Sequence, residues 1–513
     1  MSVAQVSVAA RASGPRPLTT GDGRPVAVLH LTAEYFPYAR TGGLGEAVAG
    51  LAGFQHARGL PVSVLLPLYR TVREQAPDLE PVGDPFPVPI AHRVEEARLF
   101  RIAGPREGPA VYFLEHQGFF NRPGIYAEGG VDYPDNPVRF AFLARAAVEA
   151  LPRLLRTPGV LHAHDWHTAL APVYLRTEAA TQSLSRDVST VLSVHNPGYQ
   201  GYFPRSAMDD IGLSWDLFNW RQLEWYDQLN FLKGGLTFSD MVVTVSPTHA
   251  KELRTPEGGF GLDGVFRWLG DRLVGVLNGI NQKLWDPVTD PQITARYGAD
   301  DLTGKRRCKS ALQRSYGLPQ RRRTPLFALT GRLVTQKGLD LILASTNLLH
   351  RDAQFVFLGS GERRYEQALV DLAASAPQRV GVQLEFNNRL EHRLMAGADI
   401  FMMPSLYEPC GLTQMRAQRY GAPPIGRRVG GLADTIADGE GGFLFDDYTS
   451  SAFEAAALRA LALYADRPAW EAMMKAAMRR DFGWTAPADQ YRAVYRRALA
   501  HHFAPAHHAA AAG

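Results

Sequence analysis

Residues 325–338 decide the fold, and they read PLFALTGRLVTQKG. The first six are apolar or small, as in a strand that is buried on both faces of a parallel sheet. Gly331 ends this run, and a helical pattern starts near Gly338. Ligands of open parallel sheets bind beyond the carboxyl ends of the strands, so we expect Arg332 and Lys337 to lie at a ligand site.

Strand-like runs and helical patterns alternate on both sides of this stretch. Downstream the apolar runs are QFVFLG (354–359), GVQLEF (381–386), ADIFMM (398–403) and APPIG (422–426). Upstream they are PVAVLHLTAEY (25–35), VSVLLP (62–67) and the segments 111–114, 160–163, 190–194 and 241–245. Strands separated by helices indicate parallel sheets covered on both faces. The fold class predicted is therefore α/β, with two doubly wound, Rossmann-like domains that face each other across an interdomain cleft.

The domain boundaries follow from the composition of the connecting segments. A connector rich in Asp, Pro and Asn follows Leu277, so we expect an N-terminal domain over 25–277 and a C-terminal domain over 278–485. A last helix at about 486–500 is expected to pack back onto the N-terminal domain. The ends, 1–24 and 501–513, are rich in small residues and are predicted to be mobile tails.

Composition excludes several classes of protein. The 513 residues carry a formal net charge of +4 with scattered basic residues, which is too little for a nucleic-acid-binding surface. No apolar stretch reaches the roughly 18 residues that a membrane span needs, and the N-terminus lacks a signal-peptide core. Two cysteines, Cys308 and Cys410, cannot build a disulfide framework, so a cytoplasmic location is expected.

The first motif that carries chemistry is RTGGLGE, residues 40–46. Glycines between a strand and a helix let backbone N–H groups approach an anion, which makes Gly42 and Gly43 candidates for phosphate binding. The spacing is not that of a dinucleotide-binding loop. A tight turn that needs positive φ explains the glycines equally well.

The second motif is HAHDWH, residues 162–167. Three histidines and an aspartate suggest a metal site, but the register of binuclear zinc hydrolases is wrong because Asp165 directly follows His164. We therefore expect no metal, and we expect polar groups that hold a hydroxylated ligand at a strand end. A packing role is the alternative.

The third motif holds Arg332 and Lys337. Two cations five residues apart at a strand end can neutralise a diphosphate, the arginine as a fork and the lysine as a point charge. The chain has only seven lysines against 48 arginines, which makes a retained lysine noteworthy. The alternative is a solvated basic turn.

The fourth motif is PSLYEPCGLT, residues 404–413. A carboxylate in a turn constrained by Pro and Gly, at the start of a helix, can accept hydrogen bonds from sugar hydroxyls. Glu408 is that carboxylate, and helix capping is its alternative role. Another glycine turn, GGLAD at 430–434, precedes a helix nearby.

Taken in order, these segments resemble bacterial glycogen synthases and the related plant starch synthases. The matching segments cover about residues 26–440 and include TGGLGE, HAHDWHTALAPVYL, SVHNPGYQG, FLKGGLTFSD, TVSPTHAKEL, VLNGIN, GRLVTQKGLD, MPSLYEPCGLTQ and VGGLADTI. The resemblance implies the GT-B glycosyltransferase fold. It also implies retaining transfer of glucose from ADP-glucose to the non-reducing end of glycogen or another α-1,4-glucan, without a cofactor. A homo-oligomer is left open.

The resemblance also assigns residues. Arg332 and Lys337 would hold the diphosphate, Glu408 the glucose hydroxyls, and the His164 carbonyl would face the anomeric centre. The remaining residues expected to bind the donor or substrate are Arg40, Gly42, Gly43, Asp165, Asn278, Cys410, Gly411, Leu412 and Thr413.

Two positions depart from the family pattern. The lysine that usually opens the first motif is Arg40 here, and an aromatic residue or histidine is replaced by Arg416. These changes leave two alternatives open: a UDP-glucose donor or a different acceptor, and a glucan-binding homologue with impaired catalysis.

Overall fold

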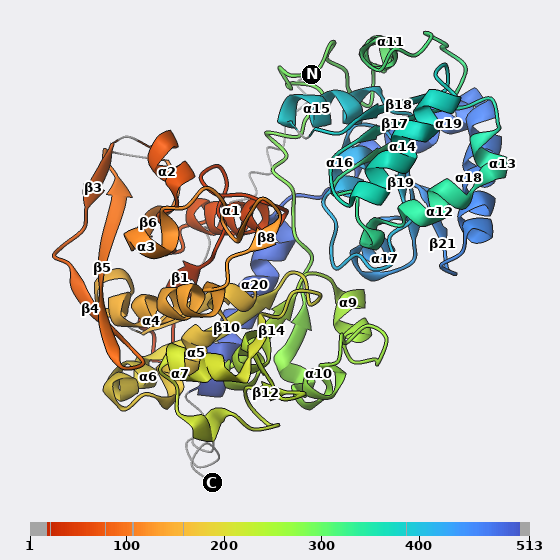
Figure 1. The fold of residues 1–513 in the computed structure, drawn as a ribbon. Helices are drawn as coiled ribbons and strands as arrows, with labels where there is room; N and C mark the ends of the chain where they lie inside the picture. The colour runs from red at the N-terminus through yellow and green to blue at the C-terminus, as the bar shows by residue number, and fades with distance from the viewer. Residues whose placement is uncertain are drawn as a thin grey trace, which may run out of the picture.

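The computed structural model describes residues 18–20, 22–76, 78–104, 107–156, 158–385 and 387–502, which fold into two lobes (Figure 1). The two predicted tails, 1–24 and 501–513, lie mostly outside these residues. Of the tail residues that are described, Leu18 is buried and Thr19 pairs with Pro25, whereas residues 22–24 are exposed, and the last helix runs to His502. The packed chain therefore begins before residue 25 and extends past residue 500.

The N-terminal lobe is built on a ten-stranded sheet. Along the sheet the order is β15-β14-β10-β9-β1-β2-β6-β5-β3, with β4 paired to β5, and the strands from β15 to β6 are parallel. The strands are β1 (Ala27–Leu31), β2 (Val62–Pro67), β3 (Leu79–Pro81), β4 (Phe86–Ile90), β5 (Arg93–Ile102), β6 (Ala110–Glu115), β9 (Gly159–His164), β10 (Val188–Val194), β14 (Met241–Thr244) and β15 (Leu273–Gly275).

The antiparallel edge formed by β3, β4 and β5 was not predicted from the sequence. Residues 79–102 are rich in proline and charged residues and contain no continuous apolar run of the kind that marks the buried strands. In the structure they form one half-buried face, and the inward positions of β4 alternate with exposed ones. Two small sheets complete the lobe: β7 (Ala127–Glu128) with β8 (Val131–Asp132), and β11 (Tyr202–Pro204), β13 (Gln228–Asn230) and β12 (Glu224–Trp225).

The C-terminal lobe is a six-stranded parallel sheet in the order β18-β17-β16-β19-β20-β21. The direction of the strand order reverses between β16 and β19, and this is where ligands of doubly wound sheets bind. The strands are β16 (Leu326–Thr330), β17 (Gln354–Leu358), β18 (Val380–Gln383), β19 (Ile400–Met403), β20 (Pro424–Arg427) and β21 (Phe443–Phe445). Both predicted Rossmann-like sheets are thus present, and the α/β fold class is confirmed.

Helices cover the two sheets (Figure 1). In the N-terminal lobe they are α1 (Leu44–Ala57), α2 (Arg70–Gln75), α3 (Gln117–Phe120), α4 (Asn136–Leu154), α5 (Leu170–Thr177), α6 (Gln182–Asp187), α7 (Met208–Ile211), α8 (Phe231–Phe238), α9 (Pro247–Glu252) and α10 (Asp263–Trp268). In the C-terminal lobe they are α11 (Thr303–Ser315), α12 (Leu339–Ala344), α13 (Thr346–Leu349), α14 (Arg363–Ser375), α15 (Asn388–Gly397), α16 (Thr413–Arg419), α17 (Gly430–Thr435), α18 (Ser450–Ala465) and α19 (Arg467–Arg479). Within the part of the chain that the structure describes, no helix has the length and apolar content needed to cross a bilayer.

The final helix, α20 (Thr485–His502), belongs to the N-terminal lobe. Its buried residues Tyr491 and Tyr495 are part of the core of that lobe, and it contacts α1 and β10. Two connections therefore join the lobes, and they run side by side: the Ile280 N–H donates to the Phe482 carbonyl at 2.8 Å, and Gln282 donates to Asp481 at 2.9 Å.

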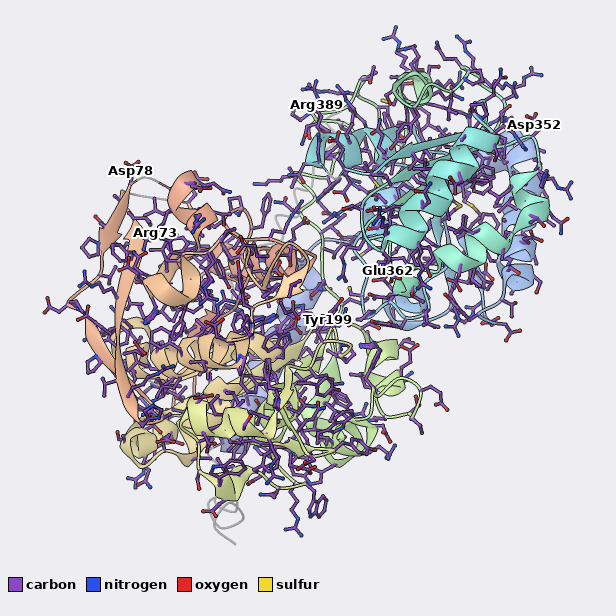
Figure 2. The ribbon with its side chains drawn as sticks, viewed as in Figure 1. Arg73, Asp78, Tyr199, Asp352, Glu362 and Arg389 are labelled. Carbon is purple, nitrogen blue, oxygen red and sulfur yellow. The ribbon has the colours of Figure 1, made fainter. Side chains whose placement is uncertain are left out.

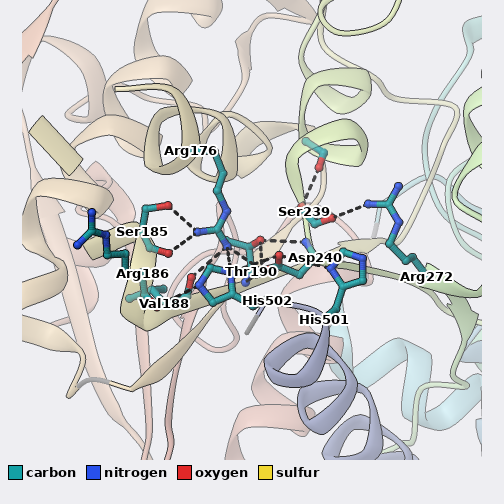
Figure 3. A network of polar contacts seen from close by, with 11 residues as sticks. Arg176, Ser185, Arg186, Val188, Thr190, Ser239, Asp240, Arg272, His501 and His502 are labelled. Carbon is teal, nitrogen blue, oxygen red and sulfur yellow. Dashed lines mark hydrogen bonds and ion pairs between the residues drawn. The ribbon is translucent and has the colours of Figure 1, made fainter. Parts of the chain in front are cut away.

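The C-terminal end of α20 is anchored by a buried carboxylate (Figure 3). Asp240 accepts hydrogen bonds from the Thr190 backbone and hydroxyl and pairs with Arg176 at 2.7 Å, while His501 and His502 approach it. Burial alone would raise the pKa of Asp240, but Arg176 and the two histidines hold it well below its usual range. His502 also hydrogen-bonds Arg176 at 3.2 Å and the Arg186 carbonyl at 3.2 Å, so polar contacts hold the last turn of the helix against the lobe.

Candidate functional site at the junction of the two lobes

In the C-terminal lobe, the predicted cation and carboxylate meet. Lys337 follows β16 and Glu408 follows β19, and these strands are neighbours, so the loops beyond their carboxyl ends lie together. The Lys337 ammonium lies 2.6 Å from Glu408 Oε2, and the Ser405 hydroxyl donates to the same oxygen at 3.1 Å. The sequence expected these two groups at different parts of the substrate, and here they form an ion pair.

Glycines let the loops approach this closely. Gly338 has φ +69°, and a β-carbon there would lie 2.0 Å from the Pro404 carbonyl oxygen. Gly430 has φ +42°, and a β-carbon there would lie 2.1 Å from the Glu408 carbonyl oxygen. Any other residue would force these loops apart, which would move Glu408 away from Lys337.

Residues 410–413 form the turn that leads into α16. Gly411 takes φ +69°, Leu412 precedes the helix, and Thr413 is its first residue. The Cys410 thiol is buried, which raises its pKa to about 12, and the Asn278 backbone hydrogen-bonds it. The predicted residues Asn278, Cys410, Gly411, Leu412 and Thr413 are therefore brought together at one place.

Arg332 reaches from the C-terminal lobe to the N-terminal lobe. It is exposed, and it donates a hydrogen bond of 2.8 Å to the Tyr199 hydroxyl. Figure 2 shows Tyr199 where the two lobes meet. Next to it the Tyr407 ring packs edge-on against Phe260, with centroids 4.8 Å apart. Arg332 thus lies between the lobes, where a ligand of both would contact it.

In the N-terminal lobe, His164 ends β9 and Asp165 follows it with φ +57°, an unfavourable region for a residue with a side chain. Such strain is characteristic of functional sites. The Asp165 carboxylate is buried, which raises its pKa to about 7, although hydrogen bonds from the His195 and Asn196 backbone N–H groups oppose the shift. The His164 backbone is bonded to Thr168, whose hydroxyl contacts both its N–H and its carbonyl.

The glycine turn at residues 41–43 faces the other lobe. A β-carbon on Gly43 would lie 3.9 Å from Leu412 Cδ1 across the junction. The backbone N–H groups of Thr41 and Gly42 donate to the Glu34 carboxylate at 2.8 and 3.3 Å. The anion that these amides hold is therefore a side chain of the same lobe, which the sequence did not predict.

Arg40 and Arg416, the two departures from the family pattern, share one partner. Arg40 pairs with Glu46 at 2.5 Å, and Arg416 pairs with the other oxygen of Glu46. Arg40 also donates to Asn388 at 2.7 Å, and Arg416 pairs with Glu391 at 3.0 Å. Four charged groups with no net charge thus connect the lobes.

The buried histidines are arranged like a metal site without having free ligand atoms. His30 on β1 is directly opposite His162 on β9, and His164 follows two residues later on the same face, so one ring nitrogen of each lies within 4.8 Å of the others. Each ring nitrogen of these three residues already has a hydrogen-bond partner. A metal would have to replace those bonds.

Two acidic residues of the junction, Glu34 and Asp434, were not predicted as part of the site from the sequence. Glu34 is buried and accepts from Tyr126 as well as from the glycine turn. An acid close to the end of a buried strand, three residues past Leu31, was the available signal, because a buried carboxylate needs donors. Asp434 of the C-terminal lobe accepts from Ser246 and from the backbone and hydroxyl of Thr248, and so caps α9 of the other lobe.

Comparison with known proteins identifies the family. Residues 27–268 match the starch synthase catalytic domain, and residues 316–478 match glycosyl transferases group 1. A glycogen synthase of Anaeromyxobacter sp. strain Fw109-5 is 46% identical over 91% of this chain and 98% of its own length. The chain belongs to the glycogen and starch synthase family. The glycogen synthase of Myxococcus xanthus is 42% identical over 92% of this chain and 99% of its own length.

Solved structures agree on the fold of this glycogen synthase family member. The catalytic domain of starch synthase IV from Arabidopsis thaliana, bound to ADP and acarbose, superposes with a TM-score of 0.85 at 33% identity, covering 93% of this chain and 99% of that domain. Sucrose-phosphate synthase from Thermosynechococcus elongatus has a TM-score of 0.58 at 17% identity, covering 93% of this chain and 99% of that one, and it shares the fold alone. The predicted GT-B architecture and glycosyltransferase class are confirmed.

Proposed function

We propose that this glycosyltransferase moves glucose from ADP-glucose to the non-reducing end of an α-1,4-glucan such as glycogen, with retention at the anomeric carbon and release of ADP. The observation that carries the proposal is the cluster of Lys337 and Glu408 beyond adjacent strands, with Arg332 beside it at the junction. The ADP and acarbose bound to Arabidopsis starch synthase IV support the choice of nucleotide and of a glucan-like acceptor.

The chemistry required is stabilisation of a leaving diphosphate. Negative charge develops on the departing oxygen, and preorganised cations lower its energy in the transition state. Arg332 and Lys337 supply that charge, so we propose that no metal or other cofactor takes part. Because Lys337 pairs with Glu408 in this structure, donor binding has to loosen that ion pair, which frees Glu408 for the glucose hydroxyls.

For retention we propose a front-face path, in which the acceptor hydroxyl gives its proton to the leaving phosphate. A double displacement would need a carboxylate nucleophile about 5 Å from the acid partner. Asp165 is the acid next to His164, but its buried carboxylate already accepts hydrogen bonds from the backbone N–H groups of His195 and Asn196, which hold it in a structural role. Trapping a covalent glucosyl-enzyme would contradict the front-face path.

The test is an incubation of the protein with glycogen and either ADP-glucose or UDP-glucose, with EDTA present. We expect release of ADP and longer glucan chains from ADP-glucose. Turnover with UDP-glucose alone would reassign the donor, and glycogen binding without turnover would indicate an impaired homologue. Activity that EDTA abolishes would contradict the absence of a metal.

We also propose a cytoplasmic location, on the ground that both cysteines are free and buried.

A further inference from the structure

Below the junction, a continuous chain of hydrogen bonds runs through the core of the N-terminal lobe. His195 contacts His164 at 3.0 Å, His164 contacts His30 at 2.9 Å, and His30 contacts the Gln55 side-chain oxygen at 2.9 Å. The Gln55 amide nitrogen then donates to the Tyr495 hydroxyl at 3.0 Å. From Tyr495 the chain continues to His162 at 2.9 Å and on to Ser193 at 2.8 Å.

The four histidines of this chain are neutral. Burial lowers the pKa of His30 and of His195 to about 4, and it lowers the pKa of His162 and His164 well below the usual value. A neutral imidazole has one N–H donor and one bare nitrogen that accepts. A ring whose two nitrogens are both hydrogen-bonded therefore donates to one neighbour and accepts from the other, so the order of donor and acceptor is the same all along the chain.

The Gln55 amide sets that direction for the whole chain. Its oxygen can only accept, so His30 must carry its proton on Nε2 and accept through Nδ1. His164 must then donate from Nε2 to His30 and accept through Nδ1, and His195 must donate from Nε2. On the other branch, Tyr495 accepts from Gln55 and donates to His162, whose Nε2–H is left for Ser193. Reversing the amide would reverse all six bonds together.

The open end of the chain is His195 Nδ1. His195 is partly exposed, whereas His30, His162 and His164 are fully buried. Within the described part of the chain, Nδ1 of His195 has no hydrogen-bond partner, and the backbone N–H of His195 donates to the Asp165 carboxylate at 2.7 Å. Four residues on, Tyr199 accepts from Arg332 of the other lobe. The bare nitrogen thus lies on the loop that meets the proposed site.

We infer that Gln55 is a positioning residue which, through His30 and His164, holds His195 as the Nε2–H tautomer, so that its unprotonated Nδ1 accepts a hydrogen bond from a sugar hydroxyl. The identification of the ligand as a sugar hydroxyl rests on the proposed function. The donor-to-acceptor direction of the hydrogen-bond chain rests on the hydrogen bonds alone. Two sources of the hydroxyl fit this chemistry: the glucose of the donor and the end of the glucan.

Nitrogen-15 NMR of the full-length protein, labelled on histidine, tests the direction without any need for activity. His195 is assigned by the signal that disappears in His195→Gln. We expect its Nδ1 to give the chemical shift of an unprotonated nitrogen in the wild type, and a mixture of tautomers in Gln55→Met, which keeps the side-chain length but cannot donate or accept. Ser193→Ala, which alters the far branch, should leave the His195 signals in place. A protonated Nδ1 in the wild type would overturn the inference.

Titration and kinetics test the ligand. The protein is titrated with ADP-glucose alone in one arm and with a short α-1,4-glucan alone in the other. We expect the His195 Nδ1 signal to shift in one of the two arms, and that arm identifies which sugar supplies the hydroxyl. A shift in neither arm would overturn the ligand half. His195→Ala and Gln55→Met should each lower kcat/KM by about tenfold, the effect of one hydrogen bond, and the double variant should lose no more than His195→Ala alone. Independent, additive losses would mean that Gln55 acts only through stability. A protein without transferase activity would refute the proposed function and leave the NMR result on the tautomer standing.

Discussion

Arg416 and Glu46 are 370 residues apart in the sequence and form an ion pair that joins the two lobes. Arg416 lies over the Trp285 ring with Cζ 4.2 Å from its centroid, and the same ring stacks on His392 with centroids 3.9 Å apart. The guanidinium is thus fixed by its own lobe before it reaches across. A residue that departs from the family pattern has acquired a structural role at the junction.

Removing the acceptor of this pair should loosen the junction. In Glu46→Gln we expect the two lobes to separate more often, because both Arg40 and Arg416 lose a charged partner. Small-angle X-ray scattering should show a larger radius of gyration. The apparent donor affinity should fall tenfold for each 1.4 kcal/mol by which the joined state is destabilised.

Glu391→Gln is the matched control for that experiment. It alters the other carboxylate partner of Arg416, which belongs to the same lobe as Arg416. The radius of gyration should stay at the wild-type value. An equal expansion in both variants would mean that packing around Arg416, and not the link between lobes, is responsible.

Arg40→Lys separates the charge of Arg40 from its shape. The arginine uses one nitrogen for Glu46 and another for Asn388 of the other lobe, and a lysine has a single nitrogen on its end. We expect the variant to keep its pairing with Glu46, lose the bond to Asn388 and bind the donor a few-fold more weakly. Donor affinity and kcat unchanged from wild type, measured by initial rates over a range of ADP-glucose, would show that the arginine is a neutral replacement.

Lys337→Ala should reduce kcat by roughly 10²–10³, the cost of losing one charge-stabilising donor in the transition state. Glucan affinity, measured by co-sedimentation with glycogen, should be nearly unchanged. Lys283→Ala is the control, because Lys283 is an exposed lysine of the connector. A near-normal kcat in the Lys337 variant would show that this ammonium does not stabilise the leaving group.

The raised pKa of Asp165 makes the free energy of unfolding depend on pH. Its pKa is about 7 in the folded chain and near 3.8 when unfolded, so the folded state holds a proton that the unfolded state has lost between those values. The contribution of Asp165 to the free energy of unfolding therefore falls as pH rises from about 4 to 7 and is constant above that. Its size is about 4 kcal/mol.

Asp165→Asn isolates this contribution, because the amide oxygen still accepts from the His195 N–H. We expect urea unfolding to show that the free energy of unfolding of the variant, minus that of the wild type, rises from pH 5 to pH 7 and is constant from pH 7 to pH 8. A difference between the two proteins that does not vary with pH would contradict the raised pKa.

Asp434→Ala removes the cap that the C-terminal lobe provides for α9. Thr248 loses two hydrogen bonds and Ser246 one, and a lost cap costs about 0.5–2 kcal/mol. Thermal unfolding should show this loss. Asp434→Asn, which retains an oxygen acceptor, should recover most of it, and a loss of the same size in both variants would argue for charge in place of capping.

The sequence predicted the parts of this structure that depend on local pattern. Buried strands such as β16 and β19 follow from continuous apolar runs, and their adjacency brings Lys337 to Glu408, so the two halves of that cluster were found in advance. What could not be predicted was which charges pair. The Glu46 and Arg416 pair depends on how the lobes are set against each other, and the Glu34 contact depends on the path of a single turn. No periodicity in the sequence encodes either one.

The two connections between the lobes have a mechanical consequence. Since they run side by side and are bonded to each other at Ile280 and Phe482, the lobes can swing about one line, while sliding and twisting would break that bond. We therefore expect opening to be mainly a hinge motion about these paired connections, which would return the same surfaces to contact. Cleavage of one connecting segment would leave the lobes joined by the other, but the pairing of the two connections would no longer restrict how the lobes move.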